Sequence, residues 1–391
     1  MVKSQISEGG TAQSNSFADS ISIESFRGLE NVKLEGLKQV NLLVGGNNSG
    51  KTSILEAIAV LYAGTDVAQW LDVSLVREVR TFASSPDSMS LLDTISWMFP
   101  SKDVGLWDHD SAGKIILSAD TQGGDRKLSA SLTSFEGFLS EKELTGYIRR
   151  LKDQNPGEPV ADHGIELEIN YLAPSDGLFN DEGTETFQIW SQLGFRTLRR
   201  HPRKKSIVQY IPPYGHRNSS TNISALSRSL RDDNIEVLND LMTSLDGRIS
   251  GVELVTTENS HKPQIAVRLQ DRRLVPLSVM GDGTRRALSI SLSILASEKG
   301  ILLIDEIEAA FHVSAFSKVF DWLMKTSEKY QVQIFATTHS LEAIEAIAKS
   351  SGDEHSLSAY AIGSKSGQVS RRYTGGMLQR LVVEAGLDIR L

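Results

Sequence analysis

The chain has 391 residues, of which 40% are hydrophobic, and its formal net charge is −8 at pH 7. This acidic balance excludes a basic field over the whole chain, so any contact with nucleic acid must come from a local patch. The absence of cysteine excludes disulfides, zinc ribbons and thiol catalysis. No apolar run approaches the roughly 20 residues that span a bilayer, so we expect a cytoplasmic protein that does not insert into a membrane.

Residues 1–20 are small and polar, and they are predicted to form a flexible tail. Alternating apolar residues in 21–46 predict short strands, and the last of these, 40–44, is continuously apolar like a buried parallel strand. Residues 53–64 have apolar side chains at helical spacing and end on Gly64. The expected order is therefore strand, glycine-rich loop and helix.

Residues 65–205 differ from the segments on either side. Loop signals such as SSPDS and DQNPGEP separate strand-like runs such as KIILSA, KLSASL and IELEINYL. We interpret this region as an inserted α/β subdomain, part helical and part antiparallel sheet.

From residue 206 the buried pattern returns, and residues 21–64 and 206–391 are together predicted to form one α/β domain. Its further expected elements, in order, are a helix at 223–245, strands in GVELVT, QIAVRL and RLVPLS, a helix at 285–297, a strand at 300–306, a helix at 313–330, a strand at 332–340 and a helix in LEAIEAIAKS.

The sequence GGNNSGKT at 45–52 fits the pattern G-x-x-x-x-G-K-[ST] in the context that this pattern requires, after a strand and before a helix. Its glycines allow backbone N–H groups to surround phosphates, and the helix N-terminus adds its dipole. Lys51 would reach the β- and γ-phosphates of ATP, and Thr52 would bind Mg²⁺ through its hydroxyl. The residues expected to contact the nucleotide are Gly45, Asn47, Asn48, Ser49, Gly50, Lys51, Thr52 and Ser53.

Asp305 and Glu306 end the strand predicted at 300–306. A carboxylate at the carboxyl end of a parallel strand lies in the ligand crevice of an open α/β sheet. Asp305 would hold Mg²⁺ through water, and Glu306 would be the general base that orients the attacking water. Taken alone, the pattern also fits a strand that ends in exposed acids. The phosphate-binding loop earlier in the chain favours the catalytic interpretation.

Two weaker signals lie around this strand. Gly281 and Gly283 flank an aspartate just before the helix at 285–297, where backbone N–H groups could bind an anion, although such turns are common. His339, in ATTHS, ends the next strand and could bond the γ-phosphate and Glu306. A lone histidine is usually structural, so the interpretation depends on its order and spacing relative to the other motifs.

GGNNSGKTS, SVMGDGTRRALSISL, LLIDEIEAAFH and ATTHS, in this order, resemble the ABC-type ATPases of the RecF/SMC and OLD-like group of P-loop NTPases. The segment FRGLENVKLEGLKQVNLLVGGNNSGKTSILEAI is especially similar to OLD-related AAA-family ATPases, many of which act in bacterial anti-phage systems. In that group the motifs are the Walker A loop, the signature loop, Walker B with the D-loop, and the switch histidine. The resemblance covers about 21–64 and 206–345 and implies an ABC-type head domain with a mixed sheet.

The resemblance further implies a head-to-tail homodimer, alone or within a higher oligomer, in which the signature loop of one chain closes over ATP bound to the Walker A loop of the other. Ser278, Gly281 and Gly283 would then act on the partner's nucleotide, and 308–312 would form the D-loop at the dimer seam. Gln209 lies at a plausible place for the Q-loop residue. SVMGDG differs from the LSGGQ of transporters, which argues against a transporter subunit. No D-x-D pair follows His339, so the TOPRIM nuclease domain of full-length OLD proteins is not expected.

One segment, 196–205, could contact DNA, and binding there would depend on salt. Its basic residues are Arg196, Arg199, Arg200, Arg203, Lys204 and Lys205. Because no aromatic residues are interleaved with them and the chain is acidic, a solvated loop or a docking surface for an acidic partner fits as well.

The leading hypothesis is a dimeric ATPase that couples its nucleotide state to a separately encoded effector or nuclease in anti-phage defence. The alternative is a RecF-like repair ATPase that acts as a clamp on DNA.

Overall fold

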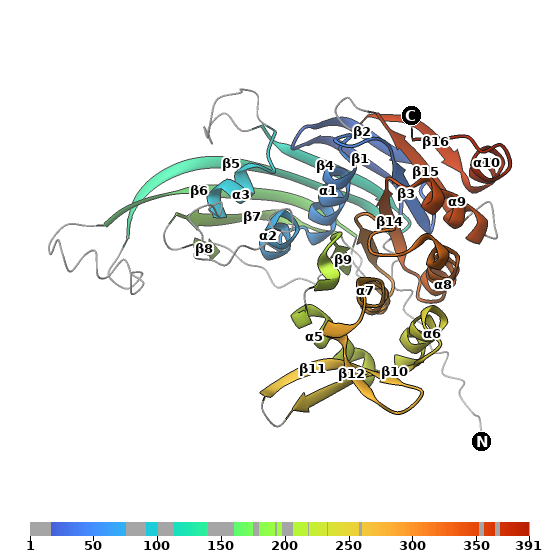
Figure 1. Ribbon diagram of the computed structural model, residues 1–391. Helices are drawn as coiled ribbons and strands as arrows, with labels where there is room; N and C mark the ends of the chain where they lie inside the picture. Colours follow the sequence, from blue (N-terminus) through green and yellow to red (C-terminus); the bar gives the residue numbers. More distant parts are fainter. Residues whose placement is uncertain are drawn as a thin grey trace, which may run out of the picture.

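The computed structural model describes residues 17–75, 91–100, 113–139, 160–174, 180–191, 194–197, 206–217, 219–232, 234–257, 260–351, 356–363 and 368–390. Two sheets with the helix Lys51–Ala63 between them form one part of the molecule, and a smaller sheet lies at the opposite end (Figure 1). Within the described residues, no helix is both long and apolar enough to cross a membrane.

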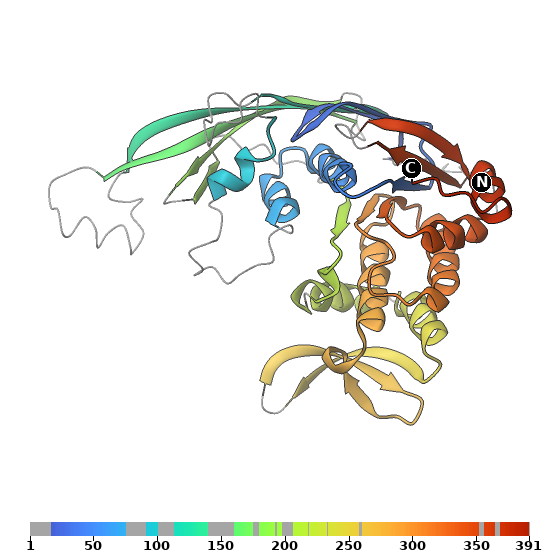
Figure 2. The same cartoon turned by 45° about the horizontal axis from the view of Figure 1, so that its top comes forward.

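A seven-stranded sheet has the order β2-β1-β4-β5-β6-β7-β8, and each neighbouring pair is antiparallel. Its strands are β1 (Ala18–Phe26), β2 (Leu29–Glu35), β4 (Ile115–Thr121), β5 (Gly124–Leu139), β6 (Val160–Ala173), β7 (Asp181–Trp190) and β8 (Gly194–Thr197). The helices α1 (Lys51–Ala63), α2 (Val67–Leu75) and α3 (Leu91–Ser96) pack along one face of this sheet, as Figure 2 shows from the side.

A six-stranded sheet of order β16-β15-β3-β14-β13-β9 carries the phosphate-binding loop. Its strands are β3 (Val40–Val44), β9 (Val208–Ile211), β13 (Ile301–Ile304), β14 (Gln333–Thr338), β15 (Leu357–Ile362) and β16 (Val369–Thr374). All pairs are parallel except β15–β16, so this is the expected mixed sheet. Every residue of β3, β13, β14 and β15 is buried, as in a parallel sheet that is covered on both faces.

The alternation of side chains along β3 shows how the two faces are covered. Leu43 packs into the apolar cluster that contains α1 and the seven-stranded sheet, whereas Leu42 packs into the cluster on the other face. Helix α1 therefore lies between the two sheets. The helices assigned to the other face are α5 (Ser219–Arg231), α6 (Ile235–Leu245), α7 (Asp282–Ala296), α8 (Phe316–Lys329), α9 (Leu341–Ser350) and α10 (Gly375–Leu378), the last followed by a π-helical turn, Gln379–Glu384.

The third sheet is three-stranded, with the order β10-β11-β12, and lies beside α5 and α6 (Figure 1). Its strands are β10 (Ile249–Thr257), β11 (Ser260–Leu269) and β12 (Leu274–Pro276). Short 3₁₀ turns occur at Gly215–Arg217, Leu277–Val279 and Val313–Ala315. These elements follow the predicted strands GVELVT, QIAVRL and RLVPLS, except that the last strand ends at Pro276 and the chain turns at once.

Two boundaries predicted from the sequence are wrong. The single helix at 223–245 is two helices, because α5 ends at Arg231 and α6 begins at Ile235 after Asn234, a residue type that favours the N-cap position. The predicted tail extends too far, since β1 begins at Ala18 and pairs on both edges. Residues 1–16 lie outside the described part of the chain.

The region 65–205 does contain helices and antiparallel strands, but its strands continue the sheet begun by β1 and β2. The edge of β1 that faces away from β2 offers unpaired backbone groups, and β4 satisfies them. A boundary at residues 64 and 65 thus divides the chain within one continuous sheet. The division into domains at 21–64, 65–205 and 206–391 remains a proposal.

Candidate functional site

The loop between β3 and α1 needs glycine at two positions. Gly45 has φ 150°, and a Cβ there would lie 2.5 Å from the carbonyl oxygen of Ile362 in β15. Gly50 has φ 93° and immediately precedes α1, and Asn48 has φ 58°, which asparagine tolerates better than most residues. Helix α1 has neither a side-chain N-cap bond nor an acid in its first turn. Its N-terminal N–H groups and dipole therefore suit an anionic ligand.

The Lys51 ammonium is held inside this loop. Nζ donates to the carbonyl oxygens of Gly45 at 3.0 Å and Gly46 at 2.7 Å, and the residue is 4% exposed. Burial lowers the pKa of Lys51, whereas the carboxylates of Asp305, Glu308 and Glu306 act to raise it. A positive charge is thus fixed beside the N-terminus of α1, where a triphosphate would meet both.

The Asp305 carboxylate joins three other elements of the fold and faces the loop. Thr52 Oγ1, from α1, lies 3.2 Å from Oδ1 and 3.1 Å from Oδ2. Thr337 of β14 donates to Oδ1 at 2.5 Å, and the Tyr210 hydroxyl of β9 donates to Oδ2 at 3.3 Å. The two residues predicted to bind Mg²⁺, Thr52 and Asp305, therefore lie within hydrogen-bond distance of each other.

A hydroxyl and a carboxylate at this distance fit Mg²⁺, which prefers oxygen ligands and commonly takes one or two protein groups plus phosphate and water. Within the described residues, no group of three or more histidine, aspartate or glutamate side chains could hold a metal by itself. This donor set is the one expected for a magnesium ion that shares its coordination with a bound nucleotide. When bound, the ion would neutralise phosphate charge between Thr52 and Asp305.

Glu306 turns its backbone into the left-handed region, with φ 48°. A non-glycine residue in this conformation costs about 1–3 kcal/mol and persists only where its surroundings enforce it. Here its N–H donates to Thr337 Oγ1 at 2.8 Å. Burial raises the pKa of Glu306, and the carboxylates of Asp305 and Glu308 raise it further. A carboxylate of raised pKa is a stronger base, which suits the predicted role of this residue.

A fully buried arginine on α7, the helix that begins at the predicted signature loop, bonds the backbone of this turn. Arg286 of α7 donates through Nη2 to the carbonyl oxygens of Asp305 at 2.9 Å and Glu306 at 3.2 Å, and through Nη1 to that of Pro212. Burial lowers the pKa of Arg286 to about 10. Sequence reasoning missed this residue, although an arginine among apolar residues of a buried helix is a detectable signal.

The backbone of His339 follows β14 and is bonded to the D-loop. Its N–H donates to Glu308 Oε1 at 2.8 Å, and the N–H of Ser340 donates to the same oxygen at 3.2 Å. Ser340 caps α9 by accepting from the N–H of Ala343 at 3.0 Å. The charge of His339 acts to lower the pKa of Glu306, so the two predicted catalytic residues interact electrostatically.

The segment 278–283, predicted to be the signature loop, lies at the surface and touches the predicted D-loop, 308–312, of the same chain. Ser278 is in a 3₁₀ turn, and Gly281 precedes α7 with free space where a Cβ would be. Gly283 lies in the first turn of α7, and a Cβ there would be 3.1 Å from the carbonyl oxygen of Ala310. Asp282, between the two glycines, pairs with Arg217 at 2.9 Å and with Arg285 at 3.1 Å.

Gln209 does not point toward this site. Tyr210 packs on the α1 side of the sheet and reaches Asp305, so its neighbour on β9 faces the opposite side. Tyr210 is thus the residue of β9 that contacts Asp305. Of the basic segment, the backbone of Arg196 lies in β8, and the other residues lie outside the described part of the chain, namely Arg199, Arg200, Arg203, Lys204 and Lys205.

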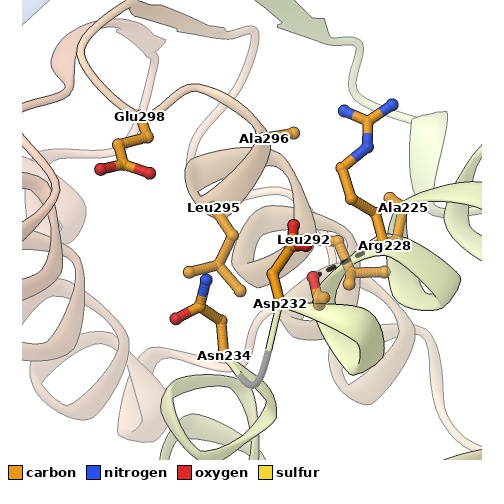
Figure 3. Close-up of a pocket in the computed structure, with 9 residues that line it drawn as sticks. Ala225, Arg228, Asp232, Asn234, Leu292, Leu295, Ala296 and Glu298 are labelled. Atoms are coloured by element: carbon orange, nitrogen blue, oxygen red, sulfur yellow. Dashed lines mark hydrogen bonds between the residues drawn. The ribbon is translucent and has the colours of Figure 1, made fainter.

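A small pocket lies elsewhere, between α5 and the end of α7 (Figure 3). Arg228, Asp232 and Asn234 line it on one side, and Leu292 and Leu295 on the other. Its interior of about 50 Å³ is far smaller than the several hundred cubic ångströms of a ligand-sized site. This pocket therefore does not compete with the loop at 45–52 as the nucleotide site.

Two family models match the chain. One, described as "AAA ATPase domain", matches residues 18–89 and spans the phosphate-binding loop. The other, described as "AAA domain, putative AbiEii toxin, Type IV TA system", matches residues 176–345 and spans the signature loop, Asp305, Glu306 and His339.

Similar proteins include an ATP/GTP phosphatase of Helicobacter pylori, 23% identical over 338 residues that cover 83% of this chain and 86% of that protein. The DNA replication and repair protein RecF of Rickettsia massiliae is 44% identical over 249 residues, which cover 62% of this chain and 55% of that protein. A solved Smc head domain of Pyrococcus furiosus, bound to the C-terminal domain of ScpA, aligns with a TM-score of 0.47 and 10% identity, covering 95% of this chain and 100% of that chain. A phosphate-binding loop opposite Asp305 in a mixed α/β sheet, together with the ATPase family model that spans this loop, identifies the chain as an ATPase with a P-loop.

Proposed function

We propose that the chain is the nucleotide-dependent switch of a homodimer, in which each ATP lies between the Walker A loop of one chain and the signature loop of the other. Hydrolysis then changes the state of a partner protein. The observation that supports this proposal best is the position of the signature loop, which lies at the surface against the D-loop of its own chain.

Exposed apolar side chains border that surface. Val279 of the signature loop is 70% exposed, Val313 after the D-loop is 55% exposed, and Tyr214 is 68% exposed. Tyr214 lies next to the signature loop, because its ring is 5.5 Å from the guanidinium of Arg217, which pairs with Asp282. Grouped exposed apolar residues are typical of a surface that another protein covers.

The chemistry proposed for each site follows from the geometry. Lys51 and the N-terminus of α1 bind the phosphates, and Thr52 and Asp305 hold Mg²⁺. Glu306 accepts a proton from the water that attacks the γ-phosphorus, and the bond to the ADP oxygen breaks. His339 donates a hydrogen bond to the γ-phosphate. Ser278, Gly281 and Gly283 of the partner complete the site by adding donors to the same phosphate.

Gly281→Arg is expected to leave ATP binding intact and to reduce hydrolysis by on the order of 100-fold, because it blocks the approach of the partner's γ-phosphate. Gly281 is preferable to Gly283, where a side chain would also press on Ala310 of the same chain. Mixing Gly281→Arg with Lys51→Ala should restore activity, since one site of each mixed dimer combines an intact Walker A loop with an intact signature loop. Steady-state ATPase rates of the separate and mixed proteins are the measurement.

Gly247→Arg is the matched control, since Gly247 also has free space around it and lies in the turn between α6 and β10. It should hydrolyse ATP at the unsubstituted rate. Full activity of Gly281→Arg, or a monomer that turns over ATP at nanomolar dilution, would contradict sites shared between two chains.

The partner is proposed to be a separately encoded effector or nuclease in bacterial anti-phage defence, and the site of action is the cytoplasm. This proposal is supported by the motif resemblance to OLD-related ATPases. It is also supported by the match over 176–345 to a family model whose description names a toxin system. The test is plaque formation on cells that carry the gene with its genomic neighbours. Protection that survives Lys51→Ala would contradict a role for ATP hydrolysis.

The similarity to RecF favours one second candidate, a DNA-binding ATPase that acts as a clamp on DNA. Reversing the charges of Arg199, Arg200 and Arg203 is then expected to weaken DNA binding and leave basal ATP hydrolysis intact. The logarithm of the DNA affinity of the unsubstituted protein should fall with the logarithm of salt concentration by about 0.9 per phosphate contact. Fluorescence anisotropy over a salt series measures the effect of the substitutions on DNA binding and the salt dependence of the affinity. DNA binding that does not change with salt or with the substitutions would contradict this candidate.

A further inference from the structure

The backbone of His339 is held from two sides by residues far away in the sequence. Its N–H donates to Glu308 Oε1 of the D-loop at 2.8 Å. Its carbonyl oxygen accepts from Arg390 Nη1 at 2.6 Å. A residue whose N–H and carbonyl are both anchored has little freedom to shift, and its Cα–Cβ direction is thereby set.

The guanidinium of Arg390 is itself fixed in direction by Asp388. Arg390 Nε lies 2.8 Å from Asp388 Oδ1, and the backbone N–H of Arg390 lies 2.9 Å from the same oxygen. These bonds hold the pKa of Asp388 down at about 2. Nη2 bonds the other carboxylate oxygen, so Nη1 is directed at His339.

Apolar contacts anchor this short segment to the domain. Ile389, between the charged pair, is buried in the same apolar cluster as Leu378 and Val382. The π-helical turn that contains Val382 packs against α9, the helix that His339 and Ser340 precede. The position of Arg390 is therefore tied to α9, the helix that begins directly after His339 and Ser340.

We propose that Arg390 is a positioning residue that places the His339 side chain for its contact with the γ-phosphate. The proposal rests on the function proposed above for His339. Arg390 bonds the main-chain carbonyl oxygen of His339. It therefore acts on the reaction through that histidine. The segment 388–390 thereby takes part in setting the rate of hydrolysis, at a distance of 51 residues along the chain from His339.

Arg390→Ala is expected to lower kcat on the order of 10-fold or more and to leave the KM for ATP unchanged, because a small displacement of a catalytic group affects the reacting geometry. Lys51 and Thr52, proposed to bind the phosphates and Mg²⁺, belong to α1 and are not altered. Arg390→Lys should recover part of kcat, because an ammonium can still donate to the His339 carbonyl. Arg380→Ala, an exposed arginine of the π-helical turn, is the matched control and should keep the full kcat.

A double-substitution cycle separates a positioning role from a general structural one. If Arg390 acts through His339, then Arg390→Ala should not lower kcat further in a His339→Ala background. The proposal would be overturned if the kcat of the double variant fell by the product of the two single-variant losses. It would also be overturned if ATP affinity fell as much as kcat. The thermal unfolding midpoints of all variants show whether a loss of kcat arises from unfolding. Partial recovery of kcat in Arg390→Lys indicates that it does not.

The same measurements separate the role proposed for His339 from the role proposed for Arg390. An unchanged kcat in His339→Ala would overturn the role proposed for His339 and the Arg390 proposal with it. A reduced kcat in His339→Ala together with an unchanged kcat in Arg390→Ala would overturn the Arg390 proposal alone.

Discussion

Glu306→Gln is expected to lower the rate of ATP hydrolysis by about 10²- to 10⁴-fold while ATP binding persists, because an amide cannot accept the proton of the attacking water. The loss should be large because burial, with the nearby carboxylates, raises the pKa of Glu306 and makes it a stronger base. Asp305 keeps its bonds to Thr52 and Thr337, so the magnesium site should remain.

The stalled protein should accumulate as an ATP-bound dimer, which size-exclusion chromatography with light scattering detects. Single-turnover hydrolysis gives the chemical rate directly. Glu328→Gln, the same change at an exposed position of α8, is the control and should not alter that rate. Normal hydrolysis by Glu306→Gln would place the general base elsewhere.

Lys51→Ala is expected to remove ATP binding and therefore all measurable turnover. The structure places the ammonium of Lys51 inside the loop at 45–52, where it bonds two backbone carbonyl oxygens. Its removal leaves the charge of the β- and γ-phosphates unopposed at that point. Titration calorimetry with ATP measures the loss of binding, and the ATPase assay measures the loss of turnover.

Since Lys51 is buried, its truncation could also affect folding, and the unfolding midpoint must be measured beside ATP binding. Lys51→Met keeps most of the side-chain length and removes the charge, so it separates charge from packing. Lys325→Ala changes an exposed lysine of α8 and serves as the control. Unchanged turnover in both Lys51 variants would refute the assignment of this loop.

The sequence alone predicted the parts of the site that local rules determine. A strand, a glycine-rich loop and a helix in succession placed Lys51 and Thr52, and a buried strand ending in acids placed Asp305 opposite them. Both inferences needed only neighbouring residues and the rule that parallel strands bring their carboxyl ends to one edge.

The residues that were not predicted act through the main chain of distant segments. Arg286 bonds the carbonyl oxygens after β13, and Arg390 bonds that of His339. A carbonyl oxygen is present at every position, so no residue type marks such a partner. Tyr210 was missed for a related reason, because the face of β9 toward Asp305 is set by pairing with β13 rather than by its own sequence.

Strand pairing over long distances limited the prediction of the fold in the same way. The strand runs KIILSA and IELEINYL were correct, but nothing in them indicated that β4 pairs with β1. The same holds for β15, which pairs with β3 inside the six-stranded sheet although it lies more than 300 residues later in the chain. Local alternation predicts a strand and its buried face, whereas its neighbours depend on which edges the rest of the fold leaves open.

The continuity of the seven-stranded sheet has a mechanical consequence. Strand β5 alone has 16 residues, which at roughly 3.3 Å per residue span about 50 Å. One end of the sheet lies over α1, the helix that begins at Lys51, and the other end extends far from it (Figure 1). A tilt of only about 5° at α1 would move the far end of such a lever arm by about 4 Å. A motion too small to alter the packing at the nucleotide would thus become a displacement that a bound protein could detect.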